Sequence, residues 1–177
     1  MILIIDLEAT CADDGSIPAE QMEIIEVGAC WATPDGQVID RFQAFVHPVA
    51  RPQLTAFCRS LTGIVQADID AASPWPAVAA DLTEFVWHHR QPGSCWGSWG
   101  NYDRKQIERE CARHDIADPL AELEHRNLKA AFAKRRKIKQ VGMATALQIA
   151  GLPLEGEHHR GLDDALNIAR LLPHMLG

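Results

Sequence analysis

The sequence lacks an excess of positive charge. Its 17 Lys and Arg residues are outnumbered by 24 Asp and Glu residues, which gives a formal net charge of −7. This balance argues against a protein that coats nucleic acid non-specifically, because such proteins are usually basic. It does not exclude an enzyme that holds nucleic acid through metal ions and a local basic patch.

Paired cysteine motifs and long hydrophobic runs are also missing. The cysteines are odd in number, widely spaced and without a CxxC motif, so reduced and mostly buried thiols of a cytoplasmic protein explain them best. The apolar run at the N-terminus follows no basic segment and is too short for a signal peptide, and no stretch approaches the length of a membrane span. We therefore expect a cytoplasmic protein without a membrane segment. The cysteines are Cys11, Cys30, Cys58, Cys95 and Cys111.

The sequence does contain enough apolar residues, 47% of the 177, for one domain spanning residues 1–177. Its first third is rich in strand patterns, and strands then alternate with helices, beginning with a helix for which Ser73 is the expected N-cap. This order predicts an α/β or α+β fold, with helices on the faces of a mixed sheet. The predicted strands are 2–6, 24–31, 38–46, 94–99 and 127–128, and the predicted helices begin near residues 73, 102, 129, 141 and 162.

Two carboxylates end the first predicted strand. Side chains at positions i and i+2 of a strand project from the same face, so Asp6 and Glu8 are expected side by side. Two like charges this close repel one another, and a site that holds both in the ionised form needs a cation. Taken alone, the same pair also fits a solvated turn after a strand.

Three further polar residues have ordinary explanations when each is taken alone. Asp103 falls at the start of a predicted helix, where a carboxylate commonly acts as a cap. His159 and Asp164 lie near the start of the last predicted helix and fit an exposed histidine and a helix N-terminus. The order of the motifs along the chain favours a different interpretation.

These residues sit within motifs that resemble the DEDDh 3′–5′ exonucleases over essentially the whole chain. The similarity is closest to the Eri-type branch, which includes RNA-trimming enzymes, and to the bacterial KapD-like proteins. In the last motif of that family a histidine precedes an aspartate by five positions, as His159 precedes Asp164. The matching segments are DLEATC (6–11), IIEVG (24–28), LTGI (61–64), WGSWGNYD (96–103), NLK (127–129) and HRGLDDALNIA (159–169).

The resemblance implies an RNase H-like fold with a five-stranded mixed sheet flanked by helices, forming a single DEDDh exonuclease domain. It implies that four acids bind two Mg²⁺ or Mn²⁺ ions and that His159 is the general base, whereas Asp163 points elsewhere, to the helix N-terminus. Carboxylate oxygens suit these ions better than zinc, and an unperturbed imidazole has a pKa near neutrality. The expected catalytic residues are Asp6, Glu8, Asp103, His159 and Asp164, and the expected metal ligands are the four acids among them.

Contacts to the substrate are predicted at the end of the first strand, in the LTGI segment and at aromatic and basic positions. The backbone amides near Ala9 and Thr10 are expected to meet the terminal nucleotide, and Trp99 and Tyr102 to stack on a base. Core packing is an alternative for Trp99, and a solvated helix face is an alternative for the basic run from Lys129 to Lys139. The expected substrate-binding residues are Ala9, Thr10, Leu61, Thr62, Trp99, Tyr102, Lys129 and Arg160.

The predicted function is a metal-dependent 3′–5′ exonuclease that releases nucleoside 5′-monophosphates from single-stranded 3′ ends, RNA more than DNA. One alternative is a regulatory interaction protein, like KapD-like inhibitors, with weak or vestigial nuclease activity. Another is a metal-dependent phosphatase or nucleotidase of unrelated fold. The full set of acids and His159 argues against a vestigial site, and the order of the motifs argues against the unrelated fold.

Overall fold

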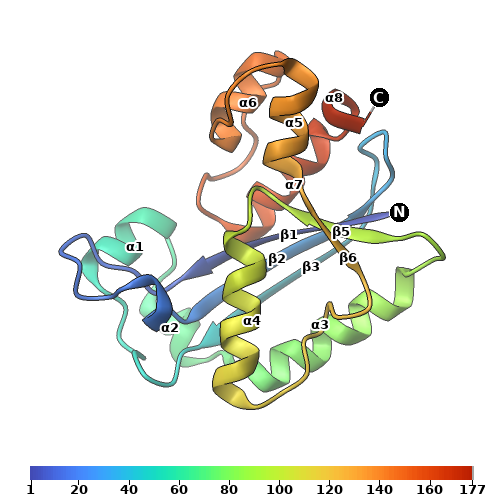
Figure 1. The fold of residues 1–177 in the computed structure, drawn as a ribbon. Coiled ribbons are helices and arrows are strands. Elements are labelled where there is room, and N and C mark those ends of the chain that lie inside the picture. Colours follow the sequence, from blue (N-terminus) through green and yellow to red (C-terminus); the bar gives the residue numbers. More distant parts are fainter. Residues whose placement is uncertain (177) are drawn as a thin grey trace.

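The computed structural model describes residues 1–176 and contains one mixed sheet with the strand order β4-β3-β2-β1-β5-β6 (Figure 1). The pairs β1–β2 and β2–β3 are antiparallel, whereas β1–β5, β5–β6 and β3–β4 are parallel. The expected α/β RNase H-like architecture is confirmed, with six strands instead of five. The strands are β1 Ile2–Ala9, β2 Ile24–Ala32, β3 Val38–His47, β4 Ser73–Pro74, β5 Cys95–Ser98 and β6 Glu124–Asn127.

The additional strand explains why one predicted helix start was wrong. Ser73 and Pro74 do not begin the helix; they pair with Val46 and His47 at the sheet edge as the two-residue strand β4. Helix α3 then starts at Trp75, with no side-chain cap. Proline fits an edge strand, because its missing N–H faces no partner there.

Helices cover both faces of the sheet (Figure 1). Helices α3 and α4 pack on one face, where their apolar residues join the core around Leu3, Ile5 and Leu7. Helices α5, α6, α7 and α8 pack on the other face, around Ile2 and Ile4. The helices are α1 Ala56–Thr62, α2 Gln66–Asp70, α3 Trp75–His89, α4 Tyr102–His114, α5 Leu128–Arg136, α6 Met143–Ala150, α7 Gly161–Leu171 and α8 Pro173–Leu176, and Ala19–Gln21 forms the 3-10 turn η1.

The alternation of side chains along β1 decides where its acids point. Because Ile2 and Ile4 face α7, the even-numbered Asp6 and Glu8 continue that same face. The strand is buried on both sides, so these carboxylates emerge only where it ends. Strand β1 therefore places Asp6 and Glu8 at the edge of the core, beneath the first turn of α7.

Two further expectations concern cysteine and membrane segments. All five cysteines are free, and four of them are buried, as the sequence predicted. Within residues 1–176, no helix combines the length and the apolar character needed to cross a membrane.

Candidate active site

Three carboxylates from two distant parts of the chain meet at the end of β1. Asp6 and Glu8 come from β1 and Asp164 from the first turn of α7, and one carboxylate oxygen of each lies within 4.8 Å of the others. Asp103, the second residue of α4, lines the same pocket, and its Oδ1 accepts a hydrogen bond of 3.1 Å from the Leu7 N–H. The structure therefore brings together the four acids that the sequence placed in one site.

A close approach between backbones makes this convergence possible. A Cβ atom added to Gly28 of β2 would lie 1.9 Å from the carbonyl carbon of Gly161, so no other residue fits without moving α7. A Cβ atom on Gly161 would lie 3.0 Å from the backbone oxygen of Asp6. The start of α7 thus rests directly on β1 and β2, which places Asp164 beside Asp6.

Two histidines complete the pocket. The Nδ1 atom of His158 lies 2.9 Å from Oδ2 of Asp164, and the rings of His158 and His159 stack with centroids 4.0 Å apart. The His159 N–H donates to the same Asp164 oxygen at 3.0 Å, and His159 has a φ of +66°. A histidine rarely adopts this left-handed backbone, so the surrounding contacts must hold it there.

The turn before the histidines is fastened to α7. Oδ2 of Asp163 accepts a 2.8 Å hydrogen bond from the Glu157 N–H, and Asn167 bonds both the N–H and the carbonyl of Glu155. Asp163 therefore points away from the candidate metal ligands, as expected, but it bonds the preceding turn and not the N-terminus of α7.

Burial and mutual repulsion shift the pKa values of the acids upward. Burial, followed by the neighbouring carboxylates, raises the pKa of Asp6 well above its ordinary value and that of Glu8 to about 8. Burial also raises the pKa of Asp103 to about 6 and the pKa of Asp164. Burial and the neighbouring His158 lower the pKa of His159, which favours its neutral form.

This donor set fits divalent cations. The converging atoms are carboxylate oxygens, the hard ligands that Mg²⁺ and Mn²⁺ prefer, and among the described residues no cysteine belongs to the ligand group formed by Asp6, Glu8 and Asp164. A cation between the carboxylates would also relieve the repulsion that raises their pKa values. The residues present are therefore suited to hold such ions.

Half of the predicted substrate contacts line the pocket, namely Ala9, Leu61, Trp99 and Tyr102. Trp99 is half-buried, and its indole N–H donates to the Val141 carbonyl at 3.0 Å, so it also packs as a core residue. Met22, Cys11, Gly142 and Met143 line the pocket as well. None of these four was predicted to contact substrate. Cys11 belongs to the matching segment DLEATC, whereas the other three lie outside the matching segments.

The remaining predicted contacts lie elsewhere or are already bonded. The Thr10 N–H donates to the Glu23 carbonyl at 2.8 Å, which occupies the amide expected to meet a nucleotide. Thr62 is buried and its hydroxyl bonds the Cys58 carbonyl, while Lys129 lies on α5 outside the pocket lining. Arg160, expected near a phosphate, instead pairs with the buried Glu26.

Comparison with known proteins agrees with this geometry. The family model described as Exonuclease (RNase_T) matches residues 3–172. Human ERI1 exoribonuclease 2 is 32% identical over 99% of this chain and 28% of its own length, and mouse 3′-5′ exoribonuclease 1 is 33% identical over 99% of this chain and 52% of its own length. The chain thus spans about half or less of these curated relatives.

Solved structures show the same fold. The nuclease domain of 3′hExo, a DEDDh family member bound to rAMP, superimposes with a TM-score of 0.89 at 28% identity, over 99% of this chain and 90% of that one. A 3′-exonuclease described as recognising the histone mRNA stem-loop gives a TM-score of 0.91 at 29% identity, over 99% and 80%. The chain belongs to the DEDDh-type exonuclease family.

Proposed function

We propose that this chain is a metal-dependent 3′–5′ exonuclease that removes nucleoside 5′-monophosphates from the 3′ end of single-stranded nucleic acid, RNA in preference to DNA. The observation that carries the proposal is the meeting of Asp6, Glu8 and Asp164 in one pocket with Asp103 and a histidine pair. The names of the family relatives support the same reaction class and RNA as the substrate.

The four acids would hold the metal. When bound, two divalent cations would supply the positive charge that stabilises the attacking and leaving oxygens of the phosphodiester. The chain's own contribution is to fix the carboxylates on two rigid elements, β1 and α7, with Asp103 tied to β1 through the Leu7 N–H. Such fixed geometry lets the site stabilise charge without reorganising during the reaction.

His159 is the proposed general base. A lowered pKa keeps its imidazole neutral near physiological pH, so it can accept a proton from the attacking water. The Nδ1–H of His158 donates to Asp164, and the ring of His158 stacks on that of His159, which restricts the ring orientation of the pair. We assign the proton transfer to His159 and the positioning of Asp164 to His158.

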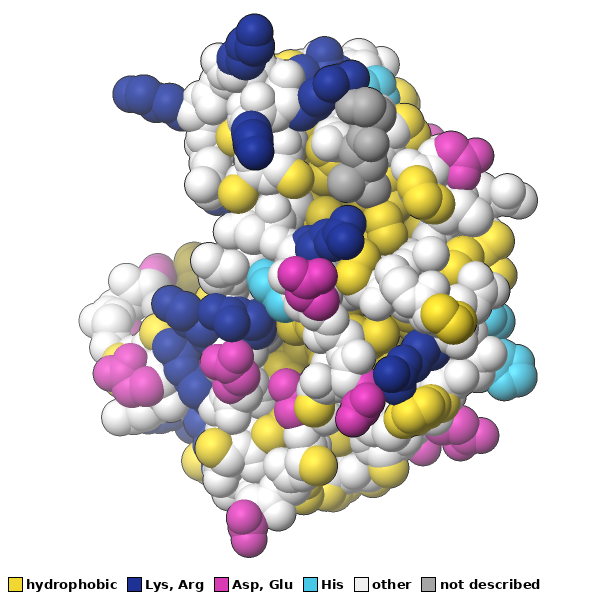
Figure 2. Space-filling view, turned by 45° about the vertical axis from the view of Figure 1, so that its right-hand side comes forward, with side chains coloured by type: hydrophobic (Ala, Val, Ile, Leu, Met, Phe, Trp, Pro, Cys, Tyr) yellow, Lys and Arg dark blue, Asp and Glu magenta, His cyan; other side chains and the backbone are white. Residues whose placement is uncertain are grey.

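The substrate would enter a hollow between two parts of the molecule. Pocket-lining residues come from α1 on one side, through Leu61, and from α6 on the other, through Met143. Figure 2 shows this hollow beneath the upper part of the molecule, where Figure 1 places α5 and α6. Tyr102 and Trp99 present aromatic surface in the pocket, which suits stacking of the terminal bases.

A basic surface above the hollow would attract the phosphate backbone. Lys and Arg side chains gather at the top of the view in Figure 2, over the end of α5, and Lys134, Arg135 and Arg136 occupy the last turn of that helix. Positive charge here would offset the negative charge of the rest of the chain. Free thiols throughout the molecule fit a reducing compartment, and we propose a cytoplasmic location.

The direct test is a gel assay with 5′-labelled single-stranded RNA and DNA of one sequence, in Mg²⁺, Mn²⁺ and EDTA, with Asp6→Ala as control. We expect a ladder that shortens from the 3′ end, requires metal and is absent in the variant, with RNA the faster substrate. Release of phosphate from mononucleotides without shortening of oligomers would favour a phosphatase instead. No cleavage by a protein that still binds metal would favour the regulatory interaction protein.

A further inference from the structure

A fifth buried carboxylate stands beside the candidate metal ligands without joining them. Glu26 of β2 is fully buried and lies directly opposite Glu8 in the antiparallel pair of β1 and β2. Both residues therefore project toward α7. The sequence showed Glu26 only as one letter of a matching motif, with no role.

Both oxygens of Glu26 are occupied by donors. Oε2 accepts from the Gly161 N–H at 3.0 Å and from Nε of Arg160 at 3.3 Å, and Oε1 accepts from Nε2 of Gln43 at 2.6 Å. The first two donors belong to the start of α7, and the third belongs to β3. One carboxylate thus ties the beginning of α7 to two strands.

The hydrogen bond from the Gly161 N–H to Glu26 substitutes for a missing helix cap. The N-cap residue of α7 is Arg160, which makes no side-chain cap bond, so the Gly161 N–H would otherwise lack an acceptor. A carboxylate at a helix N-terminus also interacts favourably with the helix dipole. Glu26 supplies both effects from a strand that lies 135 residues away in the sequence.

The fixed start of α7 sets the positions of Asp164, in its first turn, and of His159, which precedes the helix. The Asp164 N–H donates to the Arg160 carbonyl at 2.9 Å, and the Asp164 carboxylate holds the backbone of His159. The close contact of Gly28 with Gly161 leaves no space in which α7 can shift toward the sheet, and Glu26 opposes movement away from it.

We propose that Glu26 is a positioning residue, which fixes the start of α7 and the His159 backbone relative to Asp6 and Glu8 without touching substrate or metal. This inference rests on the proposed nuclease function. Arg160 acts with Glu26 in this role and is not a phosphate contact. Its guanidinium also lies 3.9 Å from Glu157, which adds a second tie to the turn that carries the histidines.

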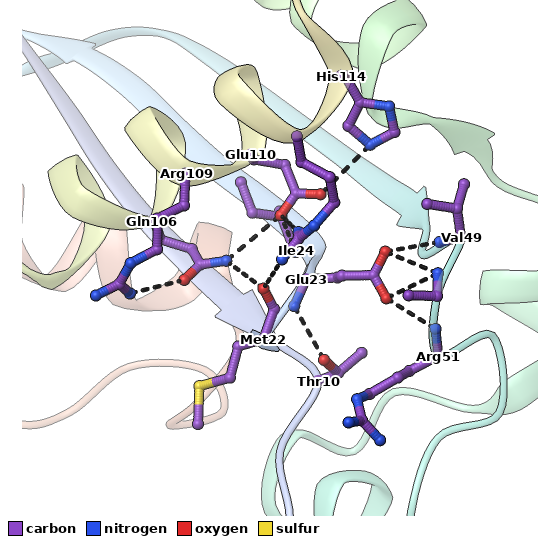
Figure 3. Close-up of polar contacts among 12 residues, drawn as sticks. Thr10, Met22, Glu23, Ile24, Val49, Arg51, Gln106, Arg109, Glu110 and His114 are labelled. Carbon is purple, nitrogen blue, oxygen red and sulfur yellow. Dashed lines mark hydrogen bonds and ion pairs between the residues drawn. The ribbon is translucent and has the colours of Figure 1, made fainter. Parts of the chain in front are cut away.

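The chain offers a matched control in Glu23. This glutamate is also fully buried, and its carboxylate accepts hydrogen bonds from the backbone N–H groups of Val49, Ala50 and Arg51, as Figure 3 shows. It therefore fixes a loop by the same chemistry, but that loop does not carry a candidate catalytic group. Glu23→Gln and Glu26→Gln remove one negative charge each from comparable surroundings.

The test measures kcat and KM on single-stranded RNA, Mn²⁺ affinity by calorimetry and the melting temperature for both variants. We expect Glu26→Gln to lower kcat and Mn²⁺ affinity by roughly 10–100-fold each, with KM little changed, as for other residues that orient metal ligands. Glu23→Gln should lower the melting temperature and leave kcat and Mn²⁺ affinity near wild type. Wild-type kcat and Mn²⁺ affinity in Glu26→Gln would overturn the proposal.

Arg160→Lys provides a second variant if Glu26→Gln does not fold. Lysine keeps the positive charge but cannot make the bidentate contact that the guanidinium makes with the Glu26 carboxylate. We expect lower kcat and weaker Mn²⁺ binding at unchanged KM. A raised KM at unchanged kcat would make Arg160 a phosphate contact. Unchanged Mn²⁺ binding would mean that the contact between Arg160 and Glu26 does not position the metal ligands, and tighter Mn²⁺ binding would make Glu26 itself a ligand. Each of these results overturns the proposal.

The Mn²⁺ titration separates this inference from the proposed function. If the wild-type protein shortens no oligonucleotide, the nuclease proposal fails. The Mn²⁺ affinity of Glu26→Gln still reports whether Glu26 positions Asp164.

Discussion

The buried and half-buried acids of this protein form two groups that differ in the hydrogen-bond partners of their carboxylates. Glu23, Glu26 and Glu110 each accept several hydrogen bonds from backbone or side-chain donors. Asp6 and Glu8 take part in no side-chain hydrogen bond among the described residues, and their pKa values are raised by burial and by neighbouring acids. Acids with structural roles have donors around them, whereas Asp6 and Glu8 face other carboxylates. Asp103 and Asp164 are intermediate, because each also accepts a hydrogen bond from a backbone N–H.

Glu110 of α4 illustrates the group whose carboxylates have donors (Figure 3). Its Oε2 lies 2.7 Å from Nη1 of Arg113 and 3.2 Å from the Ile24 N–H, and Oε1 lies 3.5 Å from Nε2 of His114. This network joins α4 to the start of β2. An acid so surrounded stabilises the fold as an anion, whereas an acid without donors destabilises it until a cation binds.

The largest effect is expected from exchanging one acid of each group for its amide. Glu8→Gln should reduce nuclease activity to background and raise the melting temperature of the metal-free protein at about pH 9, because it removes a charge formed above a pKa of about 8. Glu110→Gln should retain nuclease activity and lower the free energy of unfolding by up to about 3–5 kcal/mol. Activity assays and thermal melts check both. Destabilisation by Glu8→Gln would break the comparison.

The next effect concerns the two histidines. His159→Ala should lower kcat by roughly 10²–10⁴-fold, the range for loss of a general base, without loss of Mn²⁺ binding. His158→Ala is the matched variant and should have a smaller effect on kcat, because it removes a contact to Asp164 and not the proton acceptor. Steady-state kinetics with saturating metal would measure kcat for both variants and show which histidine contributes more. A larger loss in His158→Ala would transfer the role of base to His158.

A weaker effect should appear in the pH dependence of stability. Raised pKa values mean that the folded state binds protons more tightly than the unfolded state, so stability falls as pH increases. For Glu8 the loss begins above its ordinary pKa of 4.5 and ends near 8, and for Asp103 it ends near 6. Thermal melts in EDTA should show this decline, and Mn²⁺ should flatten it. Metal-free stability that rises over this range would contradict the unpartnered state of the acids.

The smallest effect is expected at the end of α5, where the side chains are positively charged, unlike the acids of the pocket. Replacing Lys134 and Arg135 of α5, and Lys139 just beyond it, with Gln should weaken RNA binding and reduce the salt dependence of the affinity, by roughly 0.7 in the log–log slope for each phosphate that is no longer neutralised. Binding titrations at several salt concentrations measure the slope. An unchanged slope would make this run a solvated helix face.

The sequence predicted the parts of the site that depend on local spacing. Asp6 and Glu8 share a face because strand geometry requires it, and the five-residue offset places Asp164 where its carboxylate meets the His159 backbone. The ends of the long strands and helices were also within a few residues of those observed. Periodicity and motif order carry this information directly.

The parts that were missed depend on which partner a group finds in three dimensions. Nothing in the sequence indicated that the Thr10 N–H would bond Glu23, that Arg160 would turn to Glu26, or that His158 would contact Asp164. The edge strand β4 was missed because two residues carry no periodicity. Such pairings are decided by packing between distant segments, and the spacing of residues along the chain does not predict them.

The placement of Asp164 on α7 also determines when the site can form during synthesis of the chain. Gly161 and Glu26 are separated by 135 residues, so during synthesis the contact between them must wait on the order of 10 s at ~5–20 residues per second. Until residues 157–171 have emerged and packed on β1 and β2, the site lacks Asp164 and both histidines. If the chain is the proposed exonuclease, a growing chain is therefore unable to degrade RNA near the ribosome that makes it, and activity begins only once α7 is in place.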